Sequence, residues 1–267
     1  MLCDLHLHSS CSDGELAPAA VVEVVAAAGV SVMALADHDT VAGIPQARAR
    51  ARELDVRLVT GIEMTAYDGG RVVHLLGYGV DDTDRALLAA NRVAGLVWAQ
   101  SQERWVRKLS LDGALVSWTR DFSDAPVRLP VLIERLCRRG VGAGNAWKCY
   151  QLFVSFFAAL PSSAYGALPS TAEAAGVVRG AGGVALLAHP LRLGPARILR
   201  ALLPCVDGLE ALYSAYTSQE QSALRATARR GDKLYSCGSD YHGFFQPAYR
   251  NPRFSMPPAL AARLGVD

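Results

Sequence analysis

The sequence lacks long hydrophobic segments and a clear excess of either charge. No apolar run reaches the roughly 20 residues that a membrane span needs, and the best candidate, residues 21–36, is interrupted by Glu23, Gly29 and Ser31. The 27 basic and 25 acidic residues leave a net charge of only +2, which gives no general attraction to nucleic acid or to an anionic membrane. The sequence therefore predicts neither a membrane protein nor one held to nucleic acid by its overall charge.

The sequence also lacks paired cysteines and a leader segment. The six cysteines are far apart and never form a C-x-x-C motif. Met1 leads within two residues to Cys3 and Asp4, without the basic residues and apolar stretch of a secretory signal peptide. We therefore expect reduced thiols and a cytoplasmic location.

What the sequence does contain is an alternation of strand and helix patterns near both ends. Hydrophobic residues make up 51% of the chain, which is enough for a large core. Strands are predicted at residues 2–7, 30–37, 57–66, 72–78, 184–188 and 234–239, and helices at 18–28, at 45–52 and after the capping-box motifs that begin at Ser170 and Thr217. The turn at 68–70 predicts a hairpin. This alternation predicts an α/β fold with a parallel sheet, either open or closed into a barrel.

The middle of the chain, residues 96–169, departs from this pattern and is expected to be a mostly helical insertion. No Gly/Ser linker frames it, so the flanking segments, 1–95 and 170–267, are expected to form one domain. The insertion holds all four tryptophans, at positions 98, 105, 118 and 147. These rings could stack on a nucleobase, but their near-helical spacing favours a core role.

The six histidines follow a pattern that scattered residues would not produce. Five of them lie at or just beyond the end of a predicted strand, namely His6, His8, His38, His189 and His242. The sixth, His74, lies within the strand that follows the glycine turn, and none lies in a predicted helix or in the insertion. Because parallel α/β folds gather functional side chains at the carboxyl ends of their strands, we expect the histidines to converge.

Three carboxylates accompany the histidines: Asp13, Glu63 and Asp240. Imidazole and carboxylate ligands suit divalent ions such as Zn, Mn or Fe, and the H-x-H spacing on a strand directs both imidazoles to one side. Together these residues offer more ligands than one ion uses. The set therefore predicts a cluster of two or three divalent metal ions, of the kind that hydrolyses phosphate esters.

These motifs resemble those of the PHP (polymerase and histidinol phosphatase) family. The matching strings, in family order, are DLHLHSSCSDG at 4–14, ADHDT at 36–40, GIE at 61–63, VHLLG at 73–77, AHP at 188–190 and GSDYH at 238–242. They cover both α/β segments and leave the insertion unmatched. The resemblance implies a distorted (β/α)7 barrel with a trinuclear metal centre, the insertion capping the active site, and a metal-dependent phosphoesterase activity.

Position by position, the resemblance implies three metal sites. The first is held by His6, His8, Glu63 and Asp240, the second by Asp13, His38 and His242, and the third by His74 and His189 with Glu63 as a bridge. It assigns catalysis to Asp13, His38, Glu63 and His189, around a hydroxide shared between the metals. Asp37 or Asp39 is expected to orient His38 through its second ring nitrogen, with a plain Asx turn as the alternative for Asp39.

The first two strings resemble the subgroup that acts on 3′,5′-bisphosphonucleotides or on short oligoribonucleotides. The expected partners are a small phosphorylated substrate and short single-stranded RNA, with no membrane and no obligate protein partner. The insertion departs from the subgroup, because it offers no histidine or lysine where relatives bind phosphate. Arg128 and Arg192 are the candidate substrate-binding residues, each with a solvent-exposed role as the alternative.

Two other functions remain open at this point. The same cluster could act on a cyclic phosphodiester or a non-phosphate metabolite through the altered insertion. A metal-stabilised accessory module is disfavoured, because every ligand position is present and a structural module could tolerate gaps in a costly charged cluster.

Overall fold

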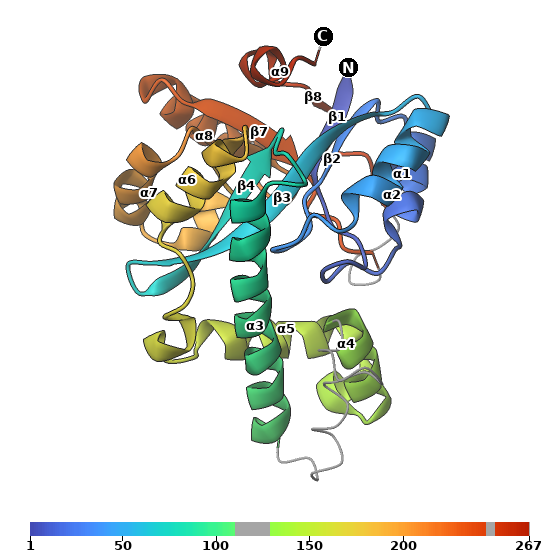
Figure 1. Cartoon of the computed structure of the whole chain (residues 1–267), viewed down its shortest axis with the longest axis vertical. Coiled ribbons are helices and arrows are strands. Elements are labelled where there is room, and N and C mark those ends of the chain that lie inside the picture. Colours follow the sequence, from blue (N-terminus) through green and yellow to red (C-terminus); the bar gives the residue numbers. More distant parts are fainter. Residues whose placement is uncertain (110–128, 244–248, 267) are drawn as a thin grey trace.

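Within residues 1–109, 129–243 and 249–266, which the computed structural model describes, the strands form one sheet that curls into a nearly closed barrel (Figure 1). The strands are β1 (Leu2–Leu7), β2 (Val32–Leu35), β3 (Arg57–Asp68), β4 (Arg71–Tyr78), β5 (Val184–Leu187), β6 (Gly208–Tyr213), β7 (Leu234–Gly238) and β8 (Phe254–Ser255). Their order in the sheet is β7-β6-β5-β4-β3-β2-β1-β8.

The pairing explains why the barrel is distorted. Strands β1, β2 and β3 are parallel, and so are β5, β6 and β7, but β4 runs antiparallel to both β3 and β5. The ring closes just beyond β7, where Asp240 N donates to His6 O at 2.9 Å and His8 N donates to Tyr241 O at 3.0 Å. The predicted distorted (β/α)7 barrel is therefore confirmed, with the short β8 added antiparallel at the edge of β1.

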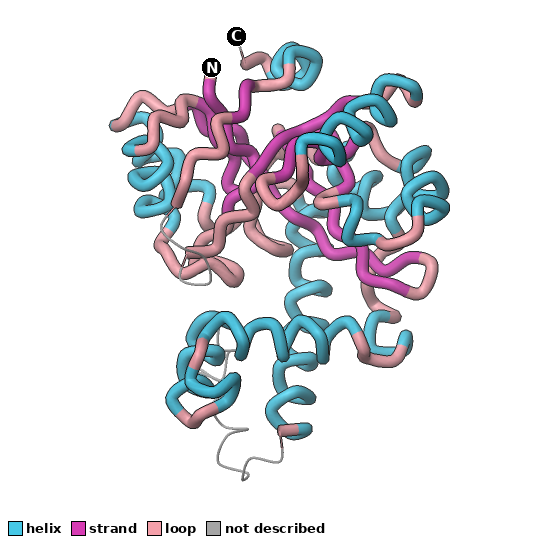
Figure 2. The backbone as a smooth tube through the Cα atoms, turned by 180° about the vertical axis from the view of Figure 1, so that it is seen from behind, coloured by secondary structure: helices cyan, strands magenta, loops and turns pink. Residues whose placement is uncertain are grey.

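Helices cover the outside of the barrel (Figure 2). They are α1 (Pro18–Ala27), α2 (Ile44–Glu53), α6 (Thr171–Gly180), α7 (Ala196–Leu202), α8 (Ser218–Arg230) and α9 (Pro258–Leu264). The two predicted capping boxes form: the side chains of Ser170 and Thr217 accept from the backbone amides of Glu173 and Glu220, whose side chains reach back in return. Such caps satisfy amides that a helix start leaves unpaired.

The insertion extends away from the barrel on one long helix (Figure 1). Helix α3 (Arg85–Lys108) begins in the part of the chain assigned to the barrel domain and passes through residue 96 without a break. Helix α5 (Ala146–Ala158) packs against α3, and α4 (Leu129–Arg138) packs against α5. These helices share a hydrophobic cluster of their own, which includes Trp105, Leu132 and Phe153, so the described part of the insertion is helical and has its own core.

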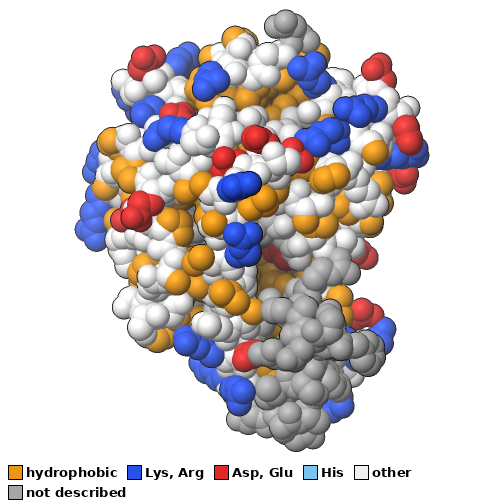
Figure 3. Space-filling view, viewed as in Figure 1, with side chains coloured by type: hydrophobic (Ala, Val, Ile, Leu, Met, Phe, Trp, Pro, Cys, Tyr) orange, Lys and Arg blue, Asp and Glu red, His pale blue; other side chains and the backbone are white. Residues whose placement is uncertain are grey.

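The surface shown in Figure 3 carries basic and acidic side chains interspersed with hydrophobic ones. In the described ranges, no helix has both the length and the apolar character that crossing a bilayer requires. The two chain ends lie together at the end of the barrel remote from the insertion (Figure 1).

Candidate metal centre

The functional side chains lie where the parallel strands end. His6 is on β1 and His8 just beyond it, with Asp13 in the following loop. His38 follows β2 and His189 follows β5. These positions share one edge of the barrel because parallel strands all end on the same side.

His74 reaches the same edge by a different route. Strand β4 runs antiparallel to β3, and His74 pairs with Thr65 in that ladder. The beginning of β4 therefore lies beside the carboxyl end of β3, which carries Glu63. The hairpin reversal explains why this histidine lies within a strand while the others follow one.

The segment after β7 approaches β1 closely. A Cβ atom on Gly238 would lie 2.2 Å from His6 Cβ, so only glycine fits where the two strands meet. Two residues later, Asp240 adopts a left-handed backbone with a φ of 57°, an uncommon conformation for a residue with a side chain. This turn directs Asp240 and the following His242 to the edge where the other histidines lie.

Glu63 lies at the middle of the cluster and is fully buried. Its Oε2 lies 3.0 Å from His6 Nε2, 3.2 Å from His8 Nε2 and 3.4 Å from His38 Nδ1. Its Oε1 lies 3.0 Å from His189 Nε2 and 3.2 Å from His74 Nδ1. One carboxylate therefore touches both halves of the cluster.

The other two carboxylates lie on the His242 side of Glu63. Asp13 Oδ1 lies 3.3 Å from His242 Nε2, and Asp13 Oδ2 lies 3.8 Å from His38 Nε2. Asp240 Oδ1 lies 3.2 Å from His8 Nε2 and 3.3 Å from His6 Nε2. The structure thus brings together all nine residues that the sequence nominated as ligands: His6, His8, Asp13, His38, Glu63, His74, His189, Asp240 and His242.

Burial and mutual charge interactions shift the pKa values of these groups in different directions. Burial raises the pKa of Glu63, but the nearby His38, His6 and His74 outweigh burial and hold that pKa well below its usual range. Burial lowers the pKa of His8, whereas the adjacent carboxylates of Asp240 and Glu63 raise it to about 10. Burial lowers the pKa of His38 to about 3, so this imidazole is neutral, as a metal ligand must be.

The donor set fits divalent metal ions. Imidazole and carboxylate atoms lie within 4.8 Å of one another in three overlapping groups among the described residues: His8, Asp13, His38 and His242; His6, His8, Glu63 and Asp240; and His38, Glu63 and His74. Both ring nitrogens of His8 and of His74 are buried and make no well-aligned hydrogen bond in the described parts of the chain, although carboxylate oxygens lie 3.2 Å from His8 Nε2 and from His74 Nδ1. Buried polar atoms of this kind normally have a partner, and a cation supplies one.

Glu210, on β6, supports this cluster and was not nominated from the sequence. It is fully buried, its Oε1 lies 2.9 Å from His6 Nδ1, and its Oε2 accepts from the backbone amide of His189 at 2.8 Å. A charged residue inside an otherwise apolar strand is the signal that could have identified it. Its bond to Nδ1 leaves the other ring nitrogen of His6 to face Glu63 and Asp240.

The expected role of Asp37 and Asp39 is wrong. Asp37 accepts from Ser9 and Ser12, and thereby holds the loop that carries Asp13. Asp39 accepts from Thr65 N at 2.7 Å and from the indole of Trp98 at 2.8 Å. Neither carboxylate makes a hydrogen bond to His38 in the described structure; both bind these other donors instead.

One of the two candidate substrate-binding arginines, Arg192, lies at the edge of the metal centre. Arg192 Nη1 lies 3.3 Å from Asp240 Oδ2, and its Nη2 donates to the hydroxyl of Tyr213, which itself donates to Asp240. The Arg192 side chain is 56% exposed, so it can still reach a ligand from the rim. Arg128 lies outside the described residues.

The insertion faces the centre with uncharged side chains that the sequence did not nominate as a set. The Tyr150 hydroxyl donates to Asp13 Oδ2 at 3.2 Å, and Trp98 lies beside His38 with ring centroids 5.7 Å apart. Among the tryptophans, the expected core role is confirmed for Trp105, which is 2% exposed. It is wrong for Trp147, which is 43% exposed and lines a cavity of about 410 Å³ together with Arg192. Trp118 lies outside the described residues.

Comparisons with known proteins agree with this geometry. The PHP domain family matches residues 4–106. The chain is 31% identical over 253 residues to a 5′-3′ exoribonuclease of Haemophilus influenzae, covering 90% of this chain and 89% of that protein. It is 31% identical over 265 residues to a phosphoribosyl 1,2-cyclic phosphate 1,2-diphosphodiesterase of Eggerthella lenta, covering 92% and 95%.

Two further comparisons point the same way. A 3′,5′-nucleoside bisphosphate phosphatase of Chromobacterium violaceum is 28% identical over 248 residues, covering 90% of this chain and 86% of that protein. Among solved structures, a protein of Bifidobacterium adolescentis assigned as a metal-dependent phosphoesterase superposes with a TM-score of 0.80 at 27% identity, covering 99% of this chain and 96% of that chain. The similarity therefore extends over the insertion as well as the barrel.

Proposed function

The chain belongs to the PHP family of metal-dependent phosphoesterases, and on this premise we propose that it hydrolyses phosphate esters of nucleotides. The observation that supports this function is the convergence of imidazole and carboxylate groups in three overlapping sets. Cavities open directly onto the cluster, lined by His38 and Asp13 on one side and by Asp240 and His242 on the other. A substrate can therefore reach the cluster from the barrel–insertion boundary.

We assign three ion positions to this chain, for Mn, Zn or Fe. The first is held by His6, His8, Glu63 and Asp240, the second by Asp13, His38 and His242, and the third by His74, His189 and Glu63. The Glu63 contacts support a bridging role, because its two oxygens face different histidines. Ions in such positions lower the pKa of water and neutralise charge on phosphoryl oxygens.

The protein residues then have separate tasks. Four of the ligand residues act in catalysis by holding the ions that face the phosphoryl group: Asp13, His38, Glu63 and His189. Arg192 binds a phosphoryl oxygen at the rim, because its guanidinium lies beside the Asp240 carboxylate of the cluster and more than half of its side chain is exposed to a ligand. Tyr150 supplies an uncharged donor at Asp13.

The substrate class that we propose is a 3′,5′-bisphosphonucleotide or the end of a short single-stranded RNA. The relatives from Haemophilus influenzae and Chromobacterium violaceum carry these activities in their names. A second candidate is a cyclic phosphodiester, favoured by the Eggerthella lenta relative, of which the chain covers 95%. The six free thiols support a cytoplasmic location for either reaction.

A panel of substrates tests the proposal. Purified protein is loaded with Mn²⁺ and its metal content is measured. Phosphate release is followed from bisphosphonucleotides and mononucleotides, and chromatography follows ring opening of cyclic phosphodiesters and release of mononucleotides from a short labelled RNA. We expect turnover of the bisphosphonucleotides or the RNA, and its loss with a chelator. Turnover confined to cyclic diesters would support the second candidate. Bound metal without turnover of any of them would contradict both.

A further inference from the structure

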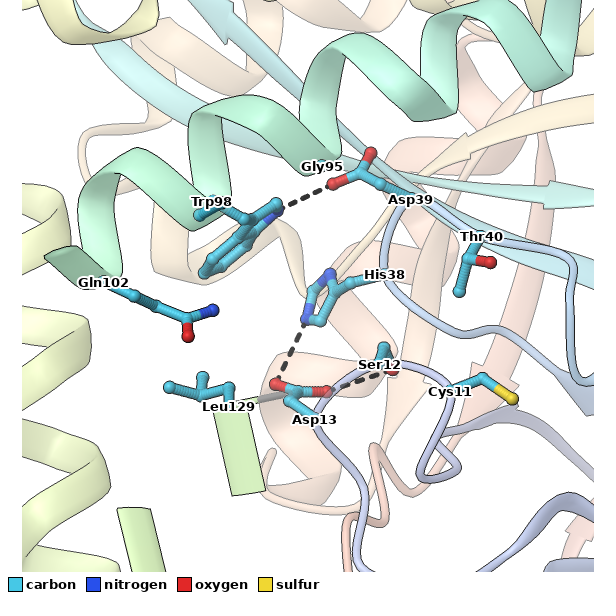
Figure 4. A pocket seen from close by; sticks show the side chains of 11 residues that line it. Cys11, Ser12, Asp13, His38, Asp39, Thr40, Gly95, Trp98, Gln102 and Leu129 are labelled. Carbon is cyan, nitrogen blue, oxygen red and sulfur yellow. Dashed lines mark hydrogen bonds and ion pairs between the residues drawn. The ribbon is translucent and has the colours of Figure 1, made fainter. Parts of the chain in front are cut away.

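A cavity of about 300 Å³ opens onto the metal centre on the side of α3. It lies between that helix and the loops that carry Asp13 and His38 (Figure 4). The proposed reaction needs the two loops but gives no role to the helix side of this cavity. The side chains that α3 contributes to it are Trp98, Ala99 and Gln102.

Gln102 places a buried carboxamide in the wall of this cavity. It is only 6% exposed, and its Oε1 is buried with no hydrogen-bond partner in the described parts of the chain. Figure 4 shows its carboxamide directed into the space between Trp98 and Asp13. A buried amide is costly to leave unsatisfied, so its position in a cavity wall marks a place where a ligand can hydrogen-bond.

The remaining walls favour a flat, neutral group. The Trp98 ring is held in place by its bond to Asp39 and by stacking on Phe157, with centroids 4.4 Å apart and planes 9° apart. Leu129 adds an apolar surface. The charged side chains among the described lining residues are the carboxylates of Asp13 and Asp39, which repel a second phosphate.

A second cavity has the complementary character. Its lining includes Arg192 together with Asp240 and His242 and shares no residue with the α3 cavity, so the cationic group lies outside the cavity that Gln102 lines. A nucleotide placed across the centre therefore has a cationic end for a phosphate and a neutral end for its remaining part.

We propose that Gln102 recognises the nucleobase of the substrate, which lies in the α3 cavity while a phosphate extends toward Arg192. A carboxamide offers one donor and one acceptor side by side, and nucleobases present adjacent donors and acceptors on their edges. This inference rests on the proposed function, because it names how that same site selects its substrate. Gln102 is then a specificity-determining residue, and the ions of the barrel act equally on substrates with and without a base.

The test compares two substrates and three proteins. Adenosine 3′,5′-bisphosphate and its abasic ribose analogue are given to the Mn²⁺-loaded wild type, to Gln102→Met and to Gln100→Met. Methionine keeps the length of the side chain and removes both hydrogen bonds. Gln100 is exposed on the same helix and serves as the matched control. Thermal unfolding and metal content verify that the variants are intact.

We expect Gln102→Met to lower kcat/KM for the adenosine substrate about tenfold, mainly through KM, and to leave the abasic substrate and metal content unchanged. Gln100→Met should match the wild type on both. An equal loss on both substrates, or no loss on either, would overturn the role of Gln102 while leaving the phosphoesterase function standing. Failure of the wild type to release phosphate from the adenosine substrate would overturn this inference, whereas the proposed function falls only if the other substrates of the panel also give no turnover.

Discussion

The barrel and the helical insertion meet at one site but bring different kinds of side chain to it. The barrel contributes buried imidazoles and carboxylates from strand ends, with Glu63 fully buried among them. Helices α3 and α5 contribute uncharged groups, namely Trp98, Gln102 and Tyr150. Under the proposed function, the barrel would perform the chemistry and the insertion would select the substrate. Substitutions in the two regions should therefore fail in different ways.

The largest loss of activity should come from replacing a barrel residue that belongs to more than one of the candidate metal-binding groups. His38→Ala removes an imidazole that belongs to two of the three groups. Because bound ions stabilise the transition state by several kcal/mol, the rate of hydrolysis should fall at least about a thousandfold, on every substrate alike. Initial rates on the substrate panel measure this loss, with circular dichroism to show that the fold is kept. Asp13→Ala should behave in the same way.

A selective loss would contradict this prediction. If His38→Ala lost activity on one substrate and kept it on another, the residue would contribute to recognition, and the proposed division between barrel and insertion would fail. Turnover within about tenfold of the wild type would remove His38 from the metal centre altogether.

The next largest effect should be a loss of metal affinity, caused by replacing a barrel residue that contacts a ligand histidine. Glu210→Gln places an amide beside His6 Nδ1, where the carboxylate now accepts. An amide that donates there forces the proton onto Nε2, the nitrogen that faces Glu63 and Asp240. Metal affinity should fall roughly 10- to 100-fold, because partners of ligand histidines fix their tautomer.

Titration of Mn²⁺ into the metal-free protein measures this change, and kcat at saturating metal should recover most of its value. Glu53→Gln, at an exposed position on α2, is the matched control. An unchanged Mn²⁺ affinity in Glu210→Gln would show that the bond to His6 has no part in holding the ions.

Metal uptake should also release protons. The pKa of His8 in the metal-free protein is raised to about 10, so this imidazole is protonated at neutral pH. A metal-bound imidazole is neutral, so an ion that binds at His8 must displace that proton. The affinity should rise with pH up to about 10, by roughly tenfold per pH unit for one displaced proton. Calorimetry in two buffers with different ionisation enthalpies measures the release, and equal heats in both would contradict it.

The barrel and the insertion also differ in how well their site residues can be predicted from the sequence. A strand has a period of two, so H-x-H is enough to place His6 and His8 on one side of β1, and the shared edge of parallel strands brings the other ligands near. His74 also follows from sequence once the glycine turn is interpreted as a hairpin.

It is harder to predict from the sequence which side chains of the helices face the metal centre. Whether Gln102 or Tyr150 faces the centre depends on how α3 and α5 are packed against the barrel, and the sequence of a helix does not determine that placement. Trp147 shows the same limit, because helical spacing does not distinguish a ring in the core from one at the rim of a cavity. Glu210 is a different case, since its environment is set by a buried strand and only its unusual charge there could have indicated a role.

The smallest effect should come from the one described arginine at the rim. Arg192→Ala removes a cation that is more than half exposed, so solvent screens much of its interaction and the loss should be modest. We expect KM for a phosphorylated substrate to rise about tenfold while kcat changes little, because the contact is made equally in the bound substrate and in the transition state. Steady-state kinetics on a bisphosphonucleotide measure both constants, and Arg197→Ala, at an exposed position on α7, is the matched control. If kcat fell with KM unchanged, Arg192 would act through Asp240 and Tyr213, its neighbours on the barrel, and would belong with the chemistry of that region.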